Sequence, residues 1–164
     1  MSKQVIHSFI ESVIRDITTF GGFPFFGAVI LFLLLLGQQN ATVFQLVVGI
    51  IFIMAIAILI RSIYFKSRPK SLPYNNWLEK IEASSFPSIH ATRVWFLAFV
   101  FGNYFQNIAI WALLAISAVA VCYSRLHMKR HDLWDLVGGT VLGIVTFKIV
   151  EFIQLFLEVW AGIP

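Results

Sequence analysis

Three short polar clusters interrupt an otherwise apolar sequence, and their residue types fit chemistry on a phosphate group. Arginines bind phosphate oxygens through paired hydrogen bonds, and histidines can attack phosphorus or protonate a leaving oxygen. A helix N-terminus adds backbone donors for an anion. In chain order the clusters contain Arg61 and Arg68, then Ser88 and His90, and then Arg125, His131 and Asp135.

The spacing within the clusters predicts how their side chains meet. Arg61 and Arg68 are seven residues apart, which places them on one face of a helix that Pro69 ends. His131 and Asp135 are four residues apart, so they face each other across one helical turn. The carboxylate would then fix one ring nitrogen and leave the other free as a base or nucleophile.

Each cluster alone also fits a structural role: arginines that reach the membrane interface, a capped helix, or a surface salt bridge. Pro87 suits the first turn of a helix, where the hydroxyl of Ser88 and nearby N–H groups point outward. All three clusters fall at the same end of the apolar runs that flank them. This coincidence favours one functional site over three unrelated ones.

The composition excludes a soluble globular protein, a disordered chain and a fibrous one. Of the 164 residues, 59% are apolar and 12% charged, against about 45–50% and about 25% in soluble domains. The single cysteine, Cys122, excludes an internal disulfide framework and a thiolate metal cluster. We expect one integral membrane domain over residues 1–164, with no nucleic-acid partner, and the sequence leaves its oligomeric state open.

Five long apolar runs predict an all-α polytopic membrane bundle. The expected spans are Gly21–Gly37, Ala41–Ile60, Ser88–Phe101, Ile108–Tyr123 and Leu136–Leu157. A polar patch, Gly102–Asn107, separates the third span from the fourth, and Gln38–Asn40 separates the first from the second. Counting crossings places the two charged connections, Lys66–Pro87 and Ser124–Asp135, on one membrane face.

The N-terminal segment differs from the spans because its apolar residues recur at helical spacing among charged ones. Val5, Ile6, Phe9 and Ile10 belong to the apolar set, and Glu11 is one of the charged residues on the other faces. The pattern predicts an amphipathic helix, either lying on the membrane surface or packed against the bundle.

The three clusters together resemble the type 2 phosphatidic acid phosphatase (PAP2) superfamily, which also contains vanadium haloperoxidases and bacterial acid phosphatases. That family's pattern is Lys-x6-Arg-Pro, then Pro-Ser-Gly-His, then Ser-Arg-x5-His-x3-Asp. The corresponding segments here are Arg61–Pro69, Pro87–His90 and Ser124–Asp135, in the same order and with the same spacing. The resemblance implies a PAP2/haloperoxidase-like helical core.

The resemblance also implies a role for each residue and a reaction that needs no metal or other cofactor. His131 would be the nucleophile that forms a phosphohistidine, and Asp135 would orient it. His90 would protonate the leaving group and then activate water. The implied phosphate-binding groups are Arg61, Arg68, Ser88, Ile89 through its backbone N–H, and Arg125.

Two positions depart from the family pattern. Arg61 replaces a lysine, which keeps the charge but changes a point donor into a planar fork. Ile89 replaces a glycine, which is costly if the position needs a positive φ but harmless if only its N–H is used. The isoleucine side chain would also narrow the pocket.

The function that these features predict is hydrolysis of a membrane lipid phosphate or diphosphate. The candidate substrate classes are phosphatidic acid, phosphatidylglycerol phosphate, isoprenoid diphosphates and lipid A phosphate. The segment His90-Ala-Thr-Arg93 resembles the corresponding segment in family members that act on polyisoprenoid diphosphates. The alternative is that Arg93 is a membrane-interface residue or pairs with Glu82. A phosphotransferase using the same intermediate and a non-catalytic membrane scaffold remain alternatives, and the intact histidines argue against the scaffold.

The membrane face of the site is the point on which two rules conflict. Most Lys and Arg residues share the face that holds the clusters, and the positive-inside rule would make this face cytoplasmic. Bacterial relatives often act outside, and several of these cations are expected to be catalytic. We expect an integral, multi-pass cell-membrane protein with an extracytoplasmic site.

Overall fold

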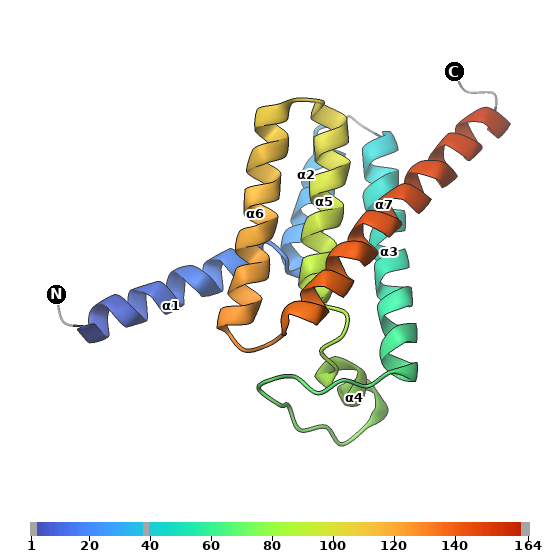
Figure 1. Ribbon diagram of the computed structural model, residues 1–164. Helices are drawn as coiled ribbons and strands as arrows, with labels where there is room; N and C mark the ends of the chain where they lie inside the picture. Colours follow the sequence, from blue (N-terminus) through green and yellow to red (C-terminus); the bar gives the residue numbers. More distant parts are fainter. Residues whose placement is uncertain (1–2, 38–39, 162–164) are drawn as a thin grey trace.

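The structure, a computed structural model, describes residues 3–37 and 40–161, and all regular elements of that part are helices (Figure 1). The expected all-α bundle is therefore confirmed, while the connection at Gln38 and Gln39 lies outside the described residues. The helices are α1 (Lys3–Thr19), α2 (Phe23–Leu35), α3 (Asn40–Ile63), α4 (Trp77–Ala83), α5 (Ile89–Phe105), α6 (Ile108–His127) and α7 (Leu133–Ala161).

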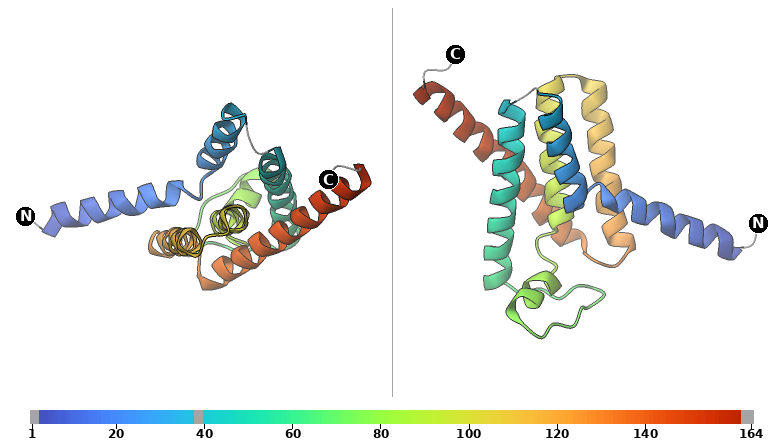
Figure 2. Two further views of the ribbon diagram at one scale, coloured as in Figure 1. Left: turned by 90° about the horizontal axis from the view of Figure 1, so that it is seen from above. Right: turned by 180° about the vertical axis from the view of Figure 1, so that it is seen from behind.

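Helix α5 lies at the centre of the bundle, with α6, α7 and α3 packed around it (Figure 2). Most of its side chains are buried, including Phe96, Leu97 and Val100. These residues form the main core together with Phe26, Leu46, Ile53 and Phe147 from the surrounding helices. The first turn of α5 is therefore held firmly at one end of the bundle.

Two glycines on α7 allow that helix to approach α5 closely. A Cβ atom on Gly139 would lie 2.5 Å from the Ser88 carbonyl oxygen, and one on Gly143 would lie 2.6 Å from that of Thr92. Both contacts are with backbone, so a larger residue would push the helices apart. The close approach brings the start of α7 against the start of α5, where two of the polar clusters lie.

The expected number of five spans is not reached by helix length alone. Helices over Ala41–Ile63, Ile108–His127 and Leu133–Trp160 are long and apolar enough to cross a membrane. A fourth span is possible if α1 and α2, which bend by 50° at their junction, count as one. The central helix α5 has 17 residues and α2 has 13, both shorter than the roughly 20 residues of a typical span.

Helix α1 leaves the bundle and extends away from it (Figure 1). Val5, Ile6 and Phe9 are exposed, whereas Ile14 is buried and Ile17 packs against the core of α5 and α6. The expected amphipathic helix is therefore present, and only its second half packs on the bundle. Its free apolar half is the part that can lie in a membrane surface.

Both charged connections lie at the same end of the bundle, as crossing parity predicts (Figure 1). Two boundaries differ from the expectation. Helix α5 continues to Phe105 because Gly102 packs on the ring of Trp111, so only Gln106 and Asn107 form the turn. The connection between α3 and α5 contains the short helix α4, whose first turn Asn76 caps by accepting from the Glu79 N–H.

Candidate active site

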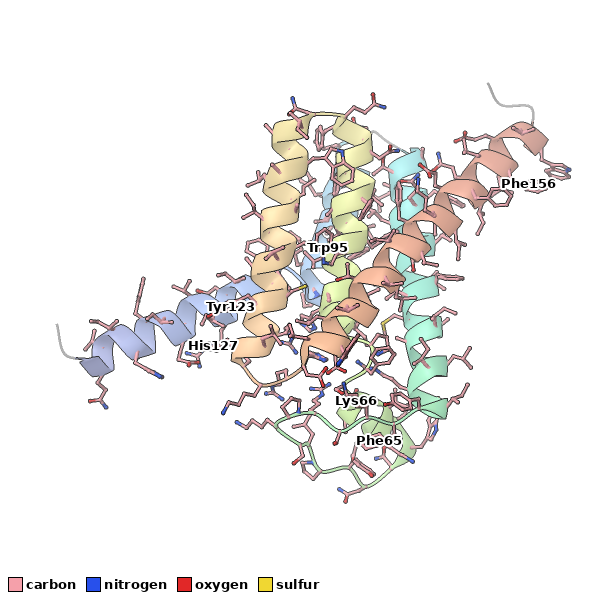
Figure 3. All side chains as sticks on the ribbon, in the orientation of Figure 1. Phe65, Lys66, Trp95, Tyr123, His127 and Phe156 are labelled. Atoms are coloured by element: carbon pink, nitrogen blue, oxygen red, sulfur yellow. The ribbon has the colours of Figure 1, made fainter. Side chains whose placement is uncertain are left out.

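The polar clusters converge on one cavity of about 370 Å³ at the end of the bundle where α5 begins. Figure 3 shows that Phe65 and Lys66, on the segment after α3, lie at this same end. Six of the eight predicted site residues line the cavity, and Ser88 and Asp135 are fully buried beside it. The lining consists of Met54, Arg61, Arg68, Leu72, Glu82, Ile89, His90, Arg93, Arg125 and His131.

Arg61 and Arg68 reach the cavity by a different route from the one predicted. Helix α3 ends at Ile63, so Arg68 lies on the loop and the two side chains do not share a helical face. Arg61 donates to the carbonyl oxygens of Ile81 (3.2 Å) and Pro87 (2.8 Å), and Arg68 donates to that of Glu82. Both arginines therefore also hold the loop that leads into α5.

Arg93 and Arg125 bring two more buried guanidiniums to the same cavity. Each residue is 7% exposed, and no arginine of the described part forms an ion pair with a carboxylate. Arg93 donates to the Gly21 carbonyl (3.3 Å) and lies over the ring of Phe23, so the predicted alternative of a pair with Glu82 is wrong. Burying a cation without a negatively charged partner costs free energy, and an anion bound in the cavity would offset that cost.

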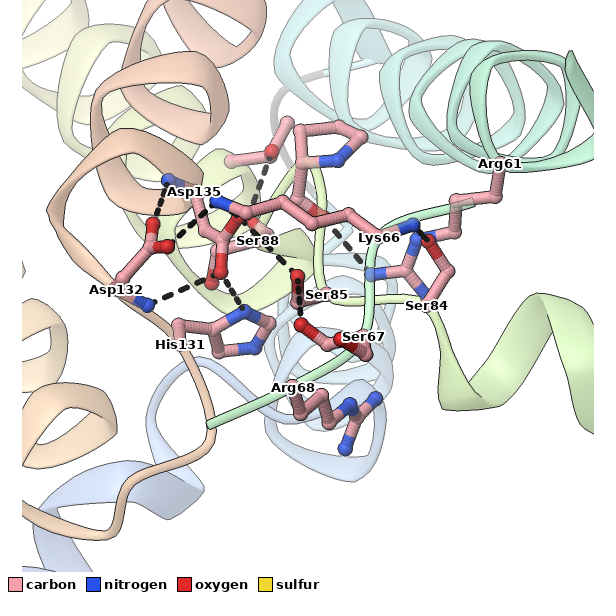
Figure 4. Close-up of polar contacts among 12 residues, drawn as sticks. Arg61, Lys66, Ser67, Arg68, Ser84, Ser85, Ser88, His131, Asp132 and Asp135 are labelled. Carbon is pink, nitrogen blue, oxygen red and sulfur yellow. Dashed lines mark hydrogen bonds and ion pairs between the residues drawn. The ribbon is translucent and has the colours of Figure 1, made fainter. Parts of the chain in front are cut away.

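His131 and Asp135 meet as their spacing predicts, although not within a helix. His131 precedes α7, which begins at Leu133, and its Nδ1 atom lies 3.5 Å from Asp135 Oδ2 (Figure 4). Burial lowers the pKa of His131, and the nearby carboxylate opposes this effect only in part. The lowered pKa favours the neutral imidazole. The 3.5 Å contact is long for a hydrogen bond, as is common in catalytic sites without a substrate.

The Asp135 carboxylate is held by a network that sequence reasoning missed (Figure 4). Oδ1 accepts from Lys66 Nζ (2.8 Å) and Ser85 Oγ (3.3 Å), and Oδ2 accepts from the Asp132 N–H (3.0 Å). Asp132 in turn accepts from the Asp135 N–H, which forms a reciprocal cap on α7. The sequence does contain a signal for this network. Asp132 and Asp135 form an Asp-x-x-Asp pair before an apolar run, and Lys66 lies between the two arginines of the first cluster.

Ser88 lies directly before α5, and its N–H and its hydroxyl have different surroundings. Its N–H donates to the Asp135 carbonyl (3.0 Å), so this backbone donor is not available to a ligand. Its Oγ is buried and has no hydrogen-bond partner in the described part of the chain. The N–H groups of Ile89 and His90 are in the first turn, where a helix offers no internal acceptor.

Ile89 is accommodated without backbone strain, because it adopts a helical conformation in the first turn of α5. Its side chain lines the arginine cavity and also an adjoining cleft of about 210 Å³. The apolar part of this cleft comes from α3, α4 and the start of α5: Met54, Ile58, Trp77, Leu78, Ile81 and Ile89. The charged cavity and this more apolar cleft share Met54, Arg61, Glu82 and Ile89 in their linings, so they adjoin each other.

The arrangement can bind a multiply charged anion next to a neutral, carboxylate-paired histidine. Arginine N–H groups would bind the equatorial oxygens of a phosphoryl group, and the free His131 nitrogen could reach its phosphorus. His90, in the first turn of α5, lines the same cavity as His131 and could donate a proton to a leaving oxygen.

Two solved structures share this architecture. LpxE of Aquifex aeolicus is 20% identical, with 87% of this chain and 85% of that chain covered and a TM-score of 0.72. The first transmembrane PAP2-type phosphatidylglycerolphosphate phosphatase from Bacillus subtilis is 18% identical, with 89% and 77% covered and a TM-score of 0.64. At these identities, the likeness establishes the fold.

The sequence match is independent of that likeness and includes the polar clusters. The profile of the PAP2 superfamily matches residues 42–155, a range that contains α3 to α6 and most of α7. Within this range the three motif segments converge on one cavity, as the family resemblance implies. The chain belongs to the PAP2 superfamily.

Proposed function

We propose that the protein is a membrane lipid phosphatase that hydrolyses a lipid phosphate or diphosphate through a phosphohistidine on His131. The observation that carries the proposal is the cavity that four arginines line around a carboxylate-paired histidine, three of them buried and Arg68 partly exposed. The cations occupy the place that Mg²⁺ takes in many phosphoryl-transfer enzymes, so the reaction would need no metal.

The proposed reaction has two steps. His131 Nε2 attacks phosphorus, the phosphorus–oxygen bond to the leaving group breaks, and His90 donates a proton to the departing oxygen. His90 then takes a proton from water, which attacks the phosphohistidine and releases inorganic phosphate. Asp135 holds the proton-bearing nitrogen of His131 throughout, so that the other nitrogen carries the lone pair.

The apolar cleft beside the cavity supports a lipid as the substrate. A phosphate held by the arginines would place the first carbons of its tail near Ile89, between α3 and α4. Trp77 and Leu78 of α4 are exposed at the mouth of this cleft, as expected for residues that meet membrane lipid. Since no folded domain covers the cavity in the described residues, we favour simple headgroups.

The number of guanidiniums supports a diphosphate over a monophosphate. Arg61, Arg68 and Arg125 occupy the three cationic positions of the family pattern, and Arg93 is a fourth arginine on the same cavity. One phosphoryl group has three non-bridging oxygens, so a fourth fork would be best used by a second phosphate. We therefore propose an isoprenoid-type diphosphate as the preferred class.

The phosphohistidine can be tested directly with the purified protein in detergent and EDTA. His131→Ala should lower phosphate release from farnesyl diphosphate by about 10³-fold or more, because the nucleophile is lost. Rapid acid-free quenching of the wild type with labelled substrate should trap label on His131. Release that requires a divalent metal, or a fully active His131→Ala variant, would contradict the mechanism; label passed mainly to an added alcohol would identify a transferase.

The pH dependence follows from the lowered pKa of His131. A lowered pKa means that the imidazole loses its proton at lower pH, so the acid limb of kcat/KM should lie below pH 6.5, the ordinary value. Because Asp135 raises that pKa, Asp135→Asn should move the limb further down as well as lowering kcat. A limb that does not move in Asp135→Asn would instead belong to the substrate phosphate.

Arg93 can be tested by comparing two substrates with the same tail. Arg93→Met should lower kcat/KM for farnesyl diphosphate by about tenfold or more, and for farnesyl monophosphate by about threefold at most. Arg93→Lys should recover part of the difference. An equal loss on both substrates would mean that Arg93 only holds the turn at Gly21 and would remove the argument for a diphosphate.

The extracytoplasmic site can be tested by labelling. Lys70 is exposed on the loop that borders the cavity, and Cys122 is the only native cysteine. We expect Lys70→Cys in a Cys122→Ala background to react with a membrane-impermeant maleimide in intact cells. Labelling only after the cells are lysed would place the site in the cytoplasm.

A further inference from the structure

Lys66 lies in the middle of the catalytic cluster but outside every position that the family pattern names. It is one of the unspecified residues between Arg61 and Arg68. Its Nζ atom lies 2.6 Å from Asp132 Oδ2 and 2.8 Å from Asp135 Oδ1, so one ammonium bridges two carboxylates (Figure 4). The Lys66 side chain is 25% exposed, whereas that of Asp135 is completely buried.

This contact determines which Asp135 oxygen faces the histidine. Lys66 and Ser85 occupy Oδ1, which leaves Oδ2 toward His131 Nδ1 and the Asp132 N–H. A free carboxylate could rotate and exchange its oxygens. With an ammonium on one oxygen, rotation would break a charge-assisted hydrogen bond, so the acceptor for the imidazole stays in place.

The ammonium also controls the charge beside the histidine. Asp132 and Asp135 are two carboxylates within one turn, and like charges this close repel each other. The two carboxylates raise the pKa of Lys66 although burial lowers it, so the lysine stays charged. Without this cation, the excess negative charge would favour protonation of His131 and remove its nucleophilic lone pair.

The backbone of Lys66 ties the same point to the second cluster. Its carbonyl accepts from the Ser85 N–H (2.7 Å), and its N–H donates to Ser84 Oγ (3.3 Å). Ser88, three residues after Ser85, donates its N–H to the backbone carbonyl of Asp135. Lys66 is therefore the residue at which the arginine segment, the start of α5 and the start of α7 are joined.

We propose that Lys66 is a positioning residue for the hydrolysis, which orients the Asp135 carboxylate toward His131 and keeps that histidine neutral. The proposal rests on the proposed function, and it assigns Lys66 no contact with the substrate. Lys66 acts through Asp135 and affects the chemical step more than binding of the phosphate.

The test compares Lys66→Met, Lys66→Arg and the charge-matched double variant Lys66→Met/Asp132→Asn with the wild type. Lys70→Met, which removes an exposed lysine of the same loop, is the control. We expect Lys66→Met to lower kcat by about tenfold or more with KM changed by about threefold at most, and Lys66→Arg to restore most of kcat. The acid limb of kcat/KM should move to higher pH in Lys66→Met, a change that a general loss of stability would not cause.

The double variant separates orientation from neutralisation and provides a folded alternative if Lys66→Met does not fold. It removes one positive and one negative group together, so the local net charge is kept while Asp135 still loses its anchor. We expect kcat to stay low. A wild-type kcat in the double variant would overturn the proposal. So would an acid limb that stays in place in Lys66→Met, together with an equal loss of kcat in Lys66→Met and Lys66→Arg.

A readout without turnover keeps this proposal separate from the proposed function. The ring nitrogens of His131 can be titrated by ¹⁵N NMR in micelles, with His131→Ala to assign the signals. We expect its midpoint to rise in Lys66→Met and to stay unchanged in Lys70→Met. Inactivity of the wild type on every lipid phosphate would refute the proposed function, while an unchanged His131 midpoint in Lys66→Met would refute the role of Lys66.

Discussion

Positive charge buried without an acidic partner is the constraint on which the rest of this structure depends. Arg93 reaches the cavity from the second turn of α5 and Arg125 from the last turn of α6, and Arg61 donates only to backbone carbonyls. Because such charges are costly in an apolar surrounding, the bundle must hold them by packing around α5. An anion in the cavity would offset this cost, so that binding it would also stabilise this end of the bundle.

The two carboxylates nearest to the histidine, those of Asp132 and Asp135, do not line the cavity, although Glu82 does. Asp135 is fully buried. The positive charge of Lys66 partly compensates the negative charges of both Asp132 and Asp135. His131 thus lies between a cationic cavity and two carboxylates whose charge one ammonium compensates in part. Because Asp135 is held by Lys66, its carboxylate is not paired with a guanidinium, and the arginine N–H groups on the cavity stay available to an anion. This arrangement also leaves the imidazole neutral and oriented, as a nucleophile requires.

The convergence of the three clusters could be predicted because it depends on coarse features: residue spacing, the ends of apolar runs and the parity of crossings. The details that failed depend on loops and on contacts between distant segments. Helix α3 ends at Ile63, so the i, i+7 argument for Arg68 does not apply. The sequence contains the lysine and the Asp-x-x-Asp pair but does not show that they meet, because they are more than 60 residues apart and come together only once α7 packs on α5.

The central claim is that the guanidinium cavity binds a phosphoryl group against His131, and a crystal structure with tungstate, a phosphate mimic, tests it most directly. We predict a tungsten peak inside the cavity, contacted by Arg61, Arg68 and Arg125 and within bonding reach of His131 Nε2. In an Arg125→Met crystal the peak should weaken or vanish. A tungsten site elsewhere on the protein, or no tungsten in the cavity at saturating tungstate, would contradict the account.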